Sequence, residues 1–221
     1  MIVVHHLNHS RSQRVLWLLE ELGLPYSIEF YERNKKTLLA PPALKKVHPL
    51  GKSPVVVDGD LVLAESGNIM ETLVERHGEG RLAPAPGTPE RQRWRYWLHY
   101  AEGSLMPPLL MKLVFDQVEK APLIVRPVAK AISAKVNAAF IRPNLKTHLD
   151  FLEAELAKSP WFAGEAFSAA DIQMSFPLEA AAARAGLDHR HPRLMDWLER
   201  IHARPAYKAA LEKGGPFEIL G

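Results

Sequence analysis

A proline-rich segment, Ala83–Pro89, separates two parts of the chain that carry different sequence patterns. Before it, short apolar runs alternate with helical periodicity, which is typical of an α/β unit. After it the strand-like runs stop, and long helical patterns rich in Ala, Leu, Glu, Lys and Arg continue. Proline interrupts regular elements and is common in connectors between domains. We therefore expect an α/β domain over residues 1–82, a linker over 83–89 and an all-helical domain over 90–221.

The first part begins in the order strand, helix, strand. Ile2–Val4 is a short β-branched run, and a helix opens at Ser10 with apolar residues at helical spacing. Gly23, with a proline two residues later, ends that helix, because glycine readily adopts the left-handed conformation of a helix C-terminus. Tyr26–Tyr31 then alternates as a second strand. Two strands joined through a helix are expected to pair in parallel.

A second unit, in the order strand, strand, helix, follows an irregular stretch that holds at most a short helix. Pro54–Val57 and Leu61–Leu63 flank an Asp58-Gly59 turn, which indicates an antiparallel hairpin. Ser66 then opens a helix that continues to Arg76. The order of the first part is therefore βαβ followed by ββα.

The helical part carries its own local signals. Prolines at 107, 108, 122 and 143 mark breaks or kinks, since proline cannot donate a backbone hydrogen bond. Ser168–Asp171 resembles a capping box with aspartate in the acidic position. We expect a helix to begin there.

The composition limits the chemistry that the chain can perform. It contains no cysteine, which excludes disulfides, cysteine-ligated zinc, iron–sulfur clusters and a cysteine nucleophile. Apolar residues make up 47% and charged residues 24%, close to the averages for folded proteins and far from those of collagen or disordered chains. Any sulfur chemistry must therefore use sulfur that arrives with a substrate.

The charge is nearly balanced, with 28 Lys and Arg against 25 Asp and Glu, a net charge of 28 − 25 = +3. Basic and acidic residues are interleaved, which argues against a nucleic-acid partner. The first residues lack the pattern of a signal peptide, and no window approaches the roughly 18 apolar residues of a membrane span. We expect a cytoplasmic protein with no membrane partner.

Four motifs in order resemble one family. His48–Val55 is similar to an Asn-Pro-x-Gly-x-x-Pro stretch, with histidine in place of the asparagine, and Leu63–Ser66 carries a Glu-Ser pair. The helix over Ser66–Arg76 and the capping motif over Phe167–Asp171 complete the set. The chain thus resembles the cytosolic glutathione transferase family, as a serine-type member without cysteine. The resemblance implies a thioredoxin-like N-terminal domain (α/β) followed by an all-α helical bundle domain.

The resemblance also implies a binding site for glutathione. A cis bond before Pro54 would leave the backbone around Ser53 free to pair with the cysteinyl part of the tripeptide. Lys52 would offer its ammonium group to a ligand carboxylate. Ser66, a good helix N-cap in itself, would place a helix N-terminus at the γ-glutamyl carboxylate, and Glu65 would take the neighbouring ammonium. A zwitterionic head needs one anion beside a set of donors, and this dipeptide supplies both.

A transferase must also ionise the glutathione thiol, because the thiolate is the nucleophile. Lowering a thiol pKa of about 8.5 by two units requires roughly 2.7 kcal/mol. Ser10 occupies the place where the family carries its catalytic residue, although with Gln13 it also fits a capping box. Ser12, Asn8 and backbone amides are alternatives for this role. Arg11 is expected beside the sulfur, where it would add positive field; the alternative is an arginine simply exposed at the surface.

The second substrate is expected on the first helices after the linker, where the family binds a small hydrophobic electrophile. Tyr100, Leu105, Met106 and Phe115 are candidates to line that site. An aromatic-rich helix fits a core or a dimer interface equally well. The resemblance further implies a homodimer.

Three functions are compatible with these residues. The first is conjugation of the glutathione thiolate to a hydrophobic electrophile, with glutathione as co-substrate and no metal, since no His-Glu-x-x-His pattern occurs among the ten histidines. The second is reduction of a disulfide or peroxide by two glutathione molecules. The third is a non-catalytic interaction module, which would have no reason to keep a zwitterion site. Whether the tail Phe217–Leu220 covers the site is left open.

Overall fold

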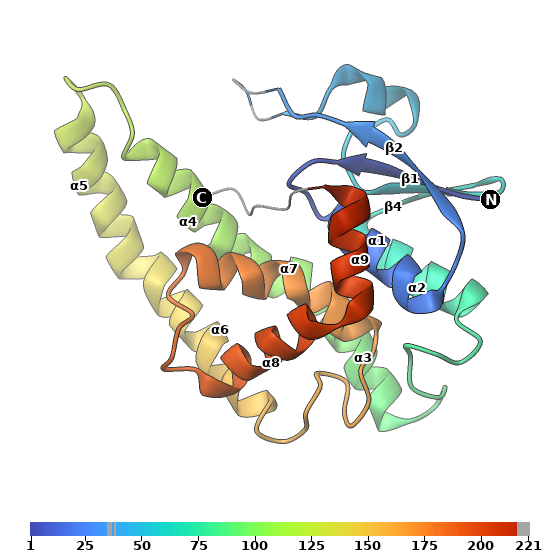
Figure 1. Ribbon diagram of the computed structural model, residues 1–221. Helices are drawn as coiled ribbons and strands as arrows, with labels where there is room; N and C mark the ends of the chain where they lie inside the picture. Colours follow the sequence, from blue (N-terminus) through green and yellow to red (C-terminus); the bar gives the residue numbers. More distant parts are fainter. Residues whose placement is uncertain (35–36, 38, 216–221) are drawn as a thin grey trace.

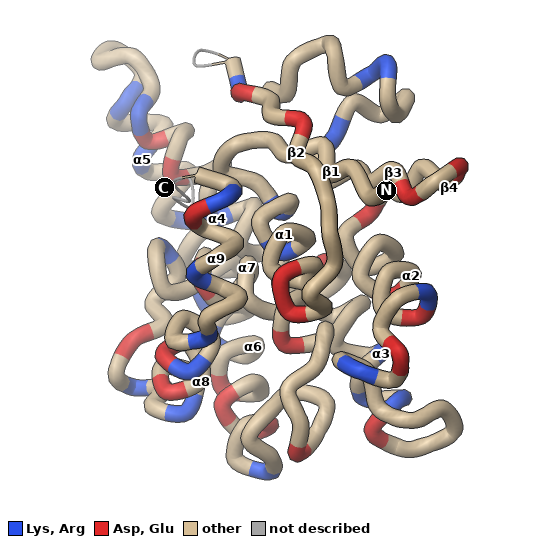
Figure 2. The backbone as a smooth tube through the Cα atoms, turned by 45° about the vertical axis from the view of Figure 1, so that its right-hand side comes forward, with Lys and Arg blue, Asp and Glu red and all other residues tan. Residues whose placement is uncertain are grey.

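The computed structural model describes residues 1–34, 37 and 39–215, so the tail around Phe217–Leu220 lies outside the described residues. A sheet with two helices against it forms one side of the molecule, and a bundle of helices forms the other (Figure 1). Basic and acidic residues are interspersed along the backbone (Figure 2). No helix of the described ranges is long and apolar enough to cross a membrane.

The sheet has four strands in the order β2-β1-β3-β4. β1 (Ile2–Leu7) pairs in parallel with β2 (Tyr26–Tyr31), and β3 (Val55–Asp58) pairs antiparallel with both β1 and β4 (Leu61–Ala64). The predicted parallel pair and hairpin are both confirmed. β1 is three residues longer than predicted because the pairing with β2 continues to its end.

Two helices pack against the sheet, α1 (Ser12–Leu22) and α2 (Ser66–His77). The prediction that Ser10 opens α1 through a capping box with Gln13 is wrong. The residue at the N-cap is Arg11, and no side chain caps the helix. Ser10 Oγ accepts instead from the backbone N–H of Ser12, and both polar atoms of the Gln13 side chain are buried without a partner. The Ser12 N–H is thus the donor to Ser10 Oγ, in place of the Gln13 N–H that a capping box would use.

The helical part contains seven α-helices in its described residues, joined in two places by a π-helical turn. The prolines at 107, 108 and 143 lie in first turns that directly follow those π turns, and Pro122 lies in the loop after α4. The helices are α3 (Pro89–Tyr100), α4 (Met106–Val118), α5 (Arg126–Val136), α6 (Arg142–Glu155), α7 (Ala169–Arg184), α8 (Pro192–Ala203) and α9 (Pro205–Gly214), the π turns are Ala101–Leu105 and Asn137–Ile141, and a short 3₁₀ helix spans Pro42–Lys46.

One continuous apolar core joins the two parts. Its largest fully buried side chains are tryptophans from α1, α3 and α8. α7 runs through this core and contacts α1, α2 and α3, while α9 returns to pack on α1. The two parts therefore hold a fixed relation, and the loops where they meet are positioned from both sides.

The predicted capping box at the start of α7 is confirmed. Ser168 Oγ accepts from the Ala170 N–H at 3.3 Å, and Asp171 Oδ2 accepts from the Ser168 N–H at 3.0 Å. Asp171 also accepts from the Phe162 N–H and from the indole N–H of Trp197. Complete burial raises the pKa of Asp171 to about 6, against the lowering effect of these hydrogen bonds. The motif thus fixes a loop and α8 as well as its own helix.

Candidate functional site

A cleft of about 280 Å³ lies between the loops of the sheet and the start of the helical part. It gathers six of the predicted site residues in one place, together with one acidic residue of the helical part that was not predicted. Its lining residues are Arg11, His48, Leu50, Lys52, Ser53, Pro54, Ala64, Glu65, Ser66 and Glu102.

One wall of the cleft is the loop that leads into β3. The peptide bond between Ser53 and Pro54 is cis, as predicted. Ser53 Oγ donates to the carbonyl of His5 at 3.0 Å and accepts from the N–H of Leu7 at 3.3 Å. These two bonds attach the loop to the end of β1. Lys52, in the same loop, is exposed.

Another wall of the cleft is the start of α2. Glu65 is exposed, occupies the N-cap position and has a φ of 67°, a left-handed conformation that is uncommon for a residue other than glycine. Ser66 is the first residue of the helix and not its cap, which corrects the expected capping role. Its Oγ accepts from Arg14 at 2.9 Å and from Gln173 at 3.2 Å. Two buried side-chain donors therefore take the hydroxyl oxygen that would otherwise cap the helix.

Glu102, on the first π turn, links the cleft to the helical part. Arg11 Nε donates to both carboxylate oxygens at 2.9 Å, and Arg14 donates to Oε1 at 2.6 Å. Burial alone would raise the pKa of Glu102, but the two guanidinium groups outweigh it and the pKa is lowered. Glu102 is thus an anion shared by two arginines, and the three side chains together carry a net charge of +1.

Arg14 holds three elements together behind the cleft. Its side chain is only 2% exposed, and it donates to the Gln173 carbonyl at 2.5 Å as well as to Ser66 and Glu102. Sequence reasoning missed Arg14 and Glu102. The sequence held one signal for Arg14. This arginine directly precedes the apolar run of α1, a position that an arginine on the solvent-exposed face of the helix need not occupy.

Ser10 lies behind the cleft and is not among its lining residues. It is 3% exposed, and its Oγ is 2.7 Å from the Oγ of Ser12. Asn8, a predicted alternative, faces another way, because its side-chain oxygen accepts from the backbone N–H of Arg33. Ser10 and Ser12 thus form one pair next to Arg11, whereas the side chain of Asn8 contacts the backbone of Arg33, just after β2.

Tyr100 and Met106 lie in the core of the helical part and do not line the cleft. The Tyr100 hydroxyl is 2.5 Å from Nδ1 of His148, and its ring contacts Trp97 and Phe151. Burial raises the pKa of this phenol. These contacts give Tyr100 a packing role, in agreement with the core alternative for an aromatic-rich helix. We therefore leave both residues out of the candidate site.

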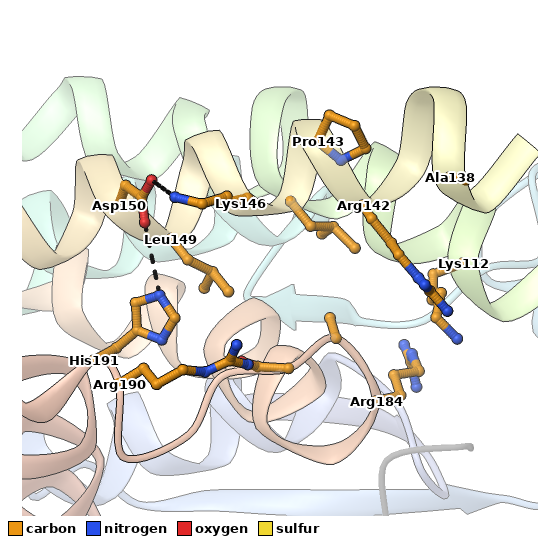
Figure 3. A pocket seen from close by; sticks show the side chains of 13 residues that line it. Lys112, Ala138, Arg142, Pro143, Lys146, Leu149, Asp150, Arg184, Arg190 and His191 are labelled. Carbon is orange, nitrogen blue, oxygen red and sulfur yellow. Dashed lines mark hydrogen bonds and ion pairs between the residues drawn. The ribbon is translucent and has the colours of Figure 1, made fainter.

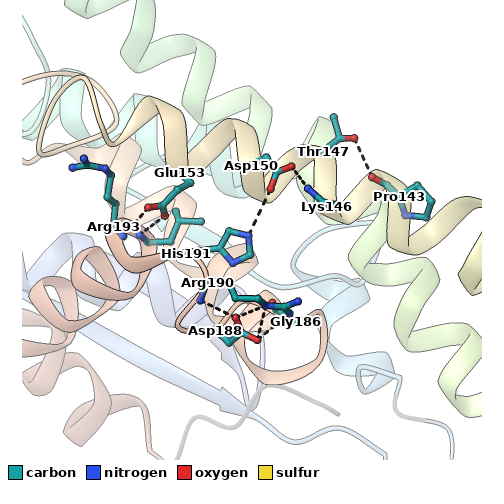
Figure 4. A network of polar contacts seen from close by, with 11 residues as sticks. Pro143, Lys146, Thr147, Asp150, Glu153, Gly186, Asp188, Arg190, His191 and Arg193 are labelled. Carbon is teal, nitrogen blue, oxygen red and sulfur yellow. Dashed lines mark hydrogen bonds and ion pairs between the residues drawn. The ribbon is translucent and has the colours of Figure 1, made fainter.

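A larger cavity, about 830 Å³, lies between α4, α6 and the loop after α7 and shares no lining residue with the cleft (Figure 3). Most of its charged side chains pair with residues a few positions away in the sequence. Lys146 donates to Asp150 at 2.5 Å, and Arg190 pairs with Asp188 in the α7–α8 loop (Figure 4). Glu153 accepts from the first N–H groups of α8. These contacts hold the α7–α8 loop and the start of α8 against α6.

Two family models match the chain. "Glutathione S-transferase, N-terminal domain" covers residues 10–76, and "Glutathione S-transferase, C-terminal domain" covers residues 115–200. Glutathione S-transferase 3 of Schizosaccharomyces pombe is 37% identical over 96% of this chain and 88% of that protein. Glutathione S-transferase 1 of Saccharomyces cerevisiae is 34% identical over 96% of this chain and 95% of that protein.

Solved structures show the same likeness. A glutathione S-transferase from Actinobacillus pleuropneumoniae superposes with a TM-score of 0.81 at 35% identity, covering 97% of this chain and 93% of the other. A sphingomonad glutathione S-transferase complexed with glutathione gives a TM-score of 0.74 at 26% identity, covering 96% and 98%. The likeness extends over both parts of the molecule.

Proposed function

Because the chain belongs to the glutathione S-transferase family, we propose that its cleft holds glutathione and that it conjugates the thiolate to a hydrophobic electrophile. Membership makes the chain a glutathione transferase. The conjugation reaction, the electrophile and the residues that act are the proposal. We also propose that the protein is cytoplasmic and that it forms a homodimer. A solution mass of twice 24.8 kDa is the test of the dimer.

The observation that carries the proposal is the pairing of opposite charges across one small cleft. Lys52 is the exposed cation at one end and suits the glycyl carboxylate of the tripeptide. At the other end Glu65 is an exposed anion beside the N-terminus of α2. The ammonium group of the ligand would bind Glu65, and the neighbouring carboxylate would bind the N-terminus of α2, because the first N–H groups of a helix have no partner within it. A molecule with a zwitterionic head and a distant carboxylate matches this arrangement.

The middle of the ligand would lie beside Ser53 and Pro54. An extended peptide there can pair with the backbone of the loop, whose position is fixed by the two hydrogen bonds of Ser53 to β1. The sulfur then falls near Arg11 and the start of α1. We propose Ser10 as the hydroxyl that acts on the thiol, helped by the positive end of α1. Charge-assisted hydrogen bonds of this kind are the strong ones, as the roughly 2.7 kcal/mol for a two-unit shift in pKa requires.

The test is binding followed by turnover. We expect the protein to be retained on immobilised glutathione and Lys52→Ala to bind about tenfold more weakly, since it loses one partly solvated charge pair. Lys135→Ala, an exposed lysine on α5, is the matched control and should bind like the wild type. A correctly folded wild-type protein that does not bind glutathione would refute the proposal.

Rates with two substrates then separate conjugation from reduction. A chloronitroarene accepts the thiolate as a conjugate, whereas hydroxyethyl disulfide is reduced by two glutathione molecules. We expect the first reaction to be faster. Binding with turnover of the disulfide alone would replace conjugation by reduction, and binding without either reaction would indicate a non-catalytic role.

A further inference from the structure

Three hydrogen-bonded side chains run inward from behind the cleft. Ser10 Oγ is 2.7 Å from Ser12 Oγ, and Ser12 Oγ is 2.9 Å from Nδ1 of His6. All three residues are buried, with exposed fractions of 3%, 0% and 3%. A buried line of hydroxyls that ends on an imidazole connects the proposed thiol-facing serine to a group that can hold a proton.

The line lies directly against the glutathione cleft. The N–H of Leu7 donates to Ser12 Oγ and to Ser53 Oγ, each at 3.3 Å, so both hydroxyls meet at the same backbone group. Ser53 and Arg11, the residue after Ser10, both line the cleft. Ser10, the outer end of the line, is therefore the sequence neighbour of Arg11, which lines the cleft proposed for the sulfur.

The relay requires one tautomer of His6. Nδ1 of His6 is 2.9 Å from Ser12 Oγ, which also lies 3.3 Å from the Leu7 carbonyl, its other acceptor. With the His6 proton on Nε2, the Ser12 hydroxyl donates to Nδ1 and the Ser10 hydroxyl donates to Ser12. Ser10 Oγ accepts from the Ser12 N–H at 3.2 Å and retains one lone pair. That lone pair is the acceptor that the relay needs for the thiol proton.

We propose that His6 and Ser12 are positioning residues through which Ser10 receives the proton of the glutathione thiol. The S–H bond breaks as a new O–H bond forms on Ser10, the former Ser10 proton passes to Ser12, and the former Ser12 proton passes to Nδ1 of His6. The products are a thiolate, two hydroxyls now turned toward it and an imidazolium. The proton returns by the same route to the product or to water, so nothing is consumed.

The surroundings of His6 set how far this transfer proceeds. Burial lowers the pKa of His6, and the charge of His9 lowers it further, while the Gly214 carbonyl raises it. The edge of the Phe30 ring from β2 covers another side of the imidazole. An imidazolium is thus unfavourable here unless a thiolate forms nearby, because attraction between opposite charges is strong in a low dielectric. His6 should gain its proton together with bound glutathione and not before.

The first experiment counts protons in the wild-type protein. The inference rests on the proposed glutathione site, so glutathione is titrated by calorimetry in buffers of different ionisation enthalpy while the ultraviolet absorbance of the thiolate is recorded. We expect thiolate to form with almost no proton released to the buffer. Release of one proton per thiolate would overturn the relay while leaving the binding site intact. Absence of binding would refute the proposed function itself.

Variants then test the two inner residues. His6→Asn can hydrogen-bond but cannot ionise, and we expect the pKa of the bound thiol to rise by about one to two units, a loss of about threefold to 25-fold in thiolate at pH 7 from a starting pKa of about 6.5. His5→Asn is the matched control, because His5 is the neighbour in β1 and bonds to Tyr31. Its thiol pKa should match the wild type. Equal pKa values in the two variants would overturn the inference.

Ser12 supplies a second, independent pair of variants. Ser12→Ala interrupts the line and should raise the thiol pKa, while Ser12→Thr keeps the hydroxyl and should restore it. Binding of S-methylglutathione, which has no thiol proton, should be the same in both. A rise in pKa with threonine as large as with alanine would show that Ser12 acts only through packing.

Discussion

Replacing Glu102 by glutamine removes the carboxylate that pairs with the buried Arg14, without changing the shape of the side chain much. Breaking a buried ion pair by neutralising one partner costs about 3–5 kcal/mol, because the remaining charge is left without compensation. Arg14 is 2% exposed but Glu102 is 29% exposed, so water can reach the site and the low end, about 3 kcal/mol, is the appropriate figure. For a chain of this size that corresponds to a fall in Tm of about 6–12 °C.

The assay is thermal unfolding followed by circular dichroism, with Glu71→Gln as the control. Glu71 pairs with Arg95 at 3.3 Å on the surface, where the arginine side chain is 57% exposed, and such pairs contribute at most about 1 kcal/mol. A Tm of Glu102→Gln equal to that of the control would refute the reasoning. In Arg14→Met the loss from Glu102→Gln should shrink, since the buried charge is no longer there.

The pH dependence of the same variant has a definite sign. The pKa of Glu102 is lowered in the folded protein, so its contribution to stability is complete above the ordinary value and is lost as the pH falls through the folded value. The Tm difference between wild type and Glu102→Gln should therefore be constant near neutral pH and close in acid. A difference that widened on acidification would contradict the assignment.

Two further variants test the scaffold. Asp171→Ala leaves the N–H groups of Phe162 and Trp197 unpaired and should lower the free energy of unfolding by on the order of 4 kcal/mol, measured with urea. Because burial raises the pKa of Asp171 to about 6, its contribution is greatest in acid, so the difference between wild type and Asp171→Asn should fall as the pH rises through 6. Tyr100→Phe should cost about 1 kcal/mol through the lost bond to His148 yet leave the conjugation rate within about twofold, and a large loss of rate would return Tyr100 to the substrate site.

Features encoded within a few consecutive residues could be predicted from the sequence. The hairpin follows from a Gly59 turn between two β-branched runs, and the capping box at Ser168 follows from its own tetrapeptide. The cis bond before Pro54 was predicted from a longer motif, whose resemblance to a family supplied what the local residues did not. In each case the partners of the interaction are neighbours in the chain.

Contacts between distant residues could not be predicted in this way. Glu102 is 88 residues from Arg14, and Arg14 is 52 residues from Ser66. An arginine in a helix is usually at the surface, and this one is buried where α1, α2, α7 and the first π turn meet. The line from Ser10 to His6 was missed for a related reason, since two adjacent histidines in a strand say nothing about which one meets a helix N-terminus.

The starts of α1 and α2 show why the two capping predictions failed together. Neither helix has a side-chain cap, and neither has a proline in its first turn. The other α-helices of the described chain have one or both of these features. A side chain that capped α1 or α2 would occupy the very N–H groups that an anion needs. Ser66 bonds to other side chains instead, whereas Ser10 Oγ accepts from the Ser12 N–H, the first amide of α1. The start of α2 is therefore the helix end that favours a carboxylate, such as the γ-glutamyl carboxylate of the proposed ligand.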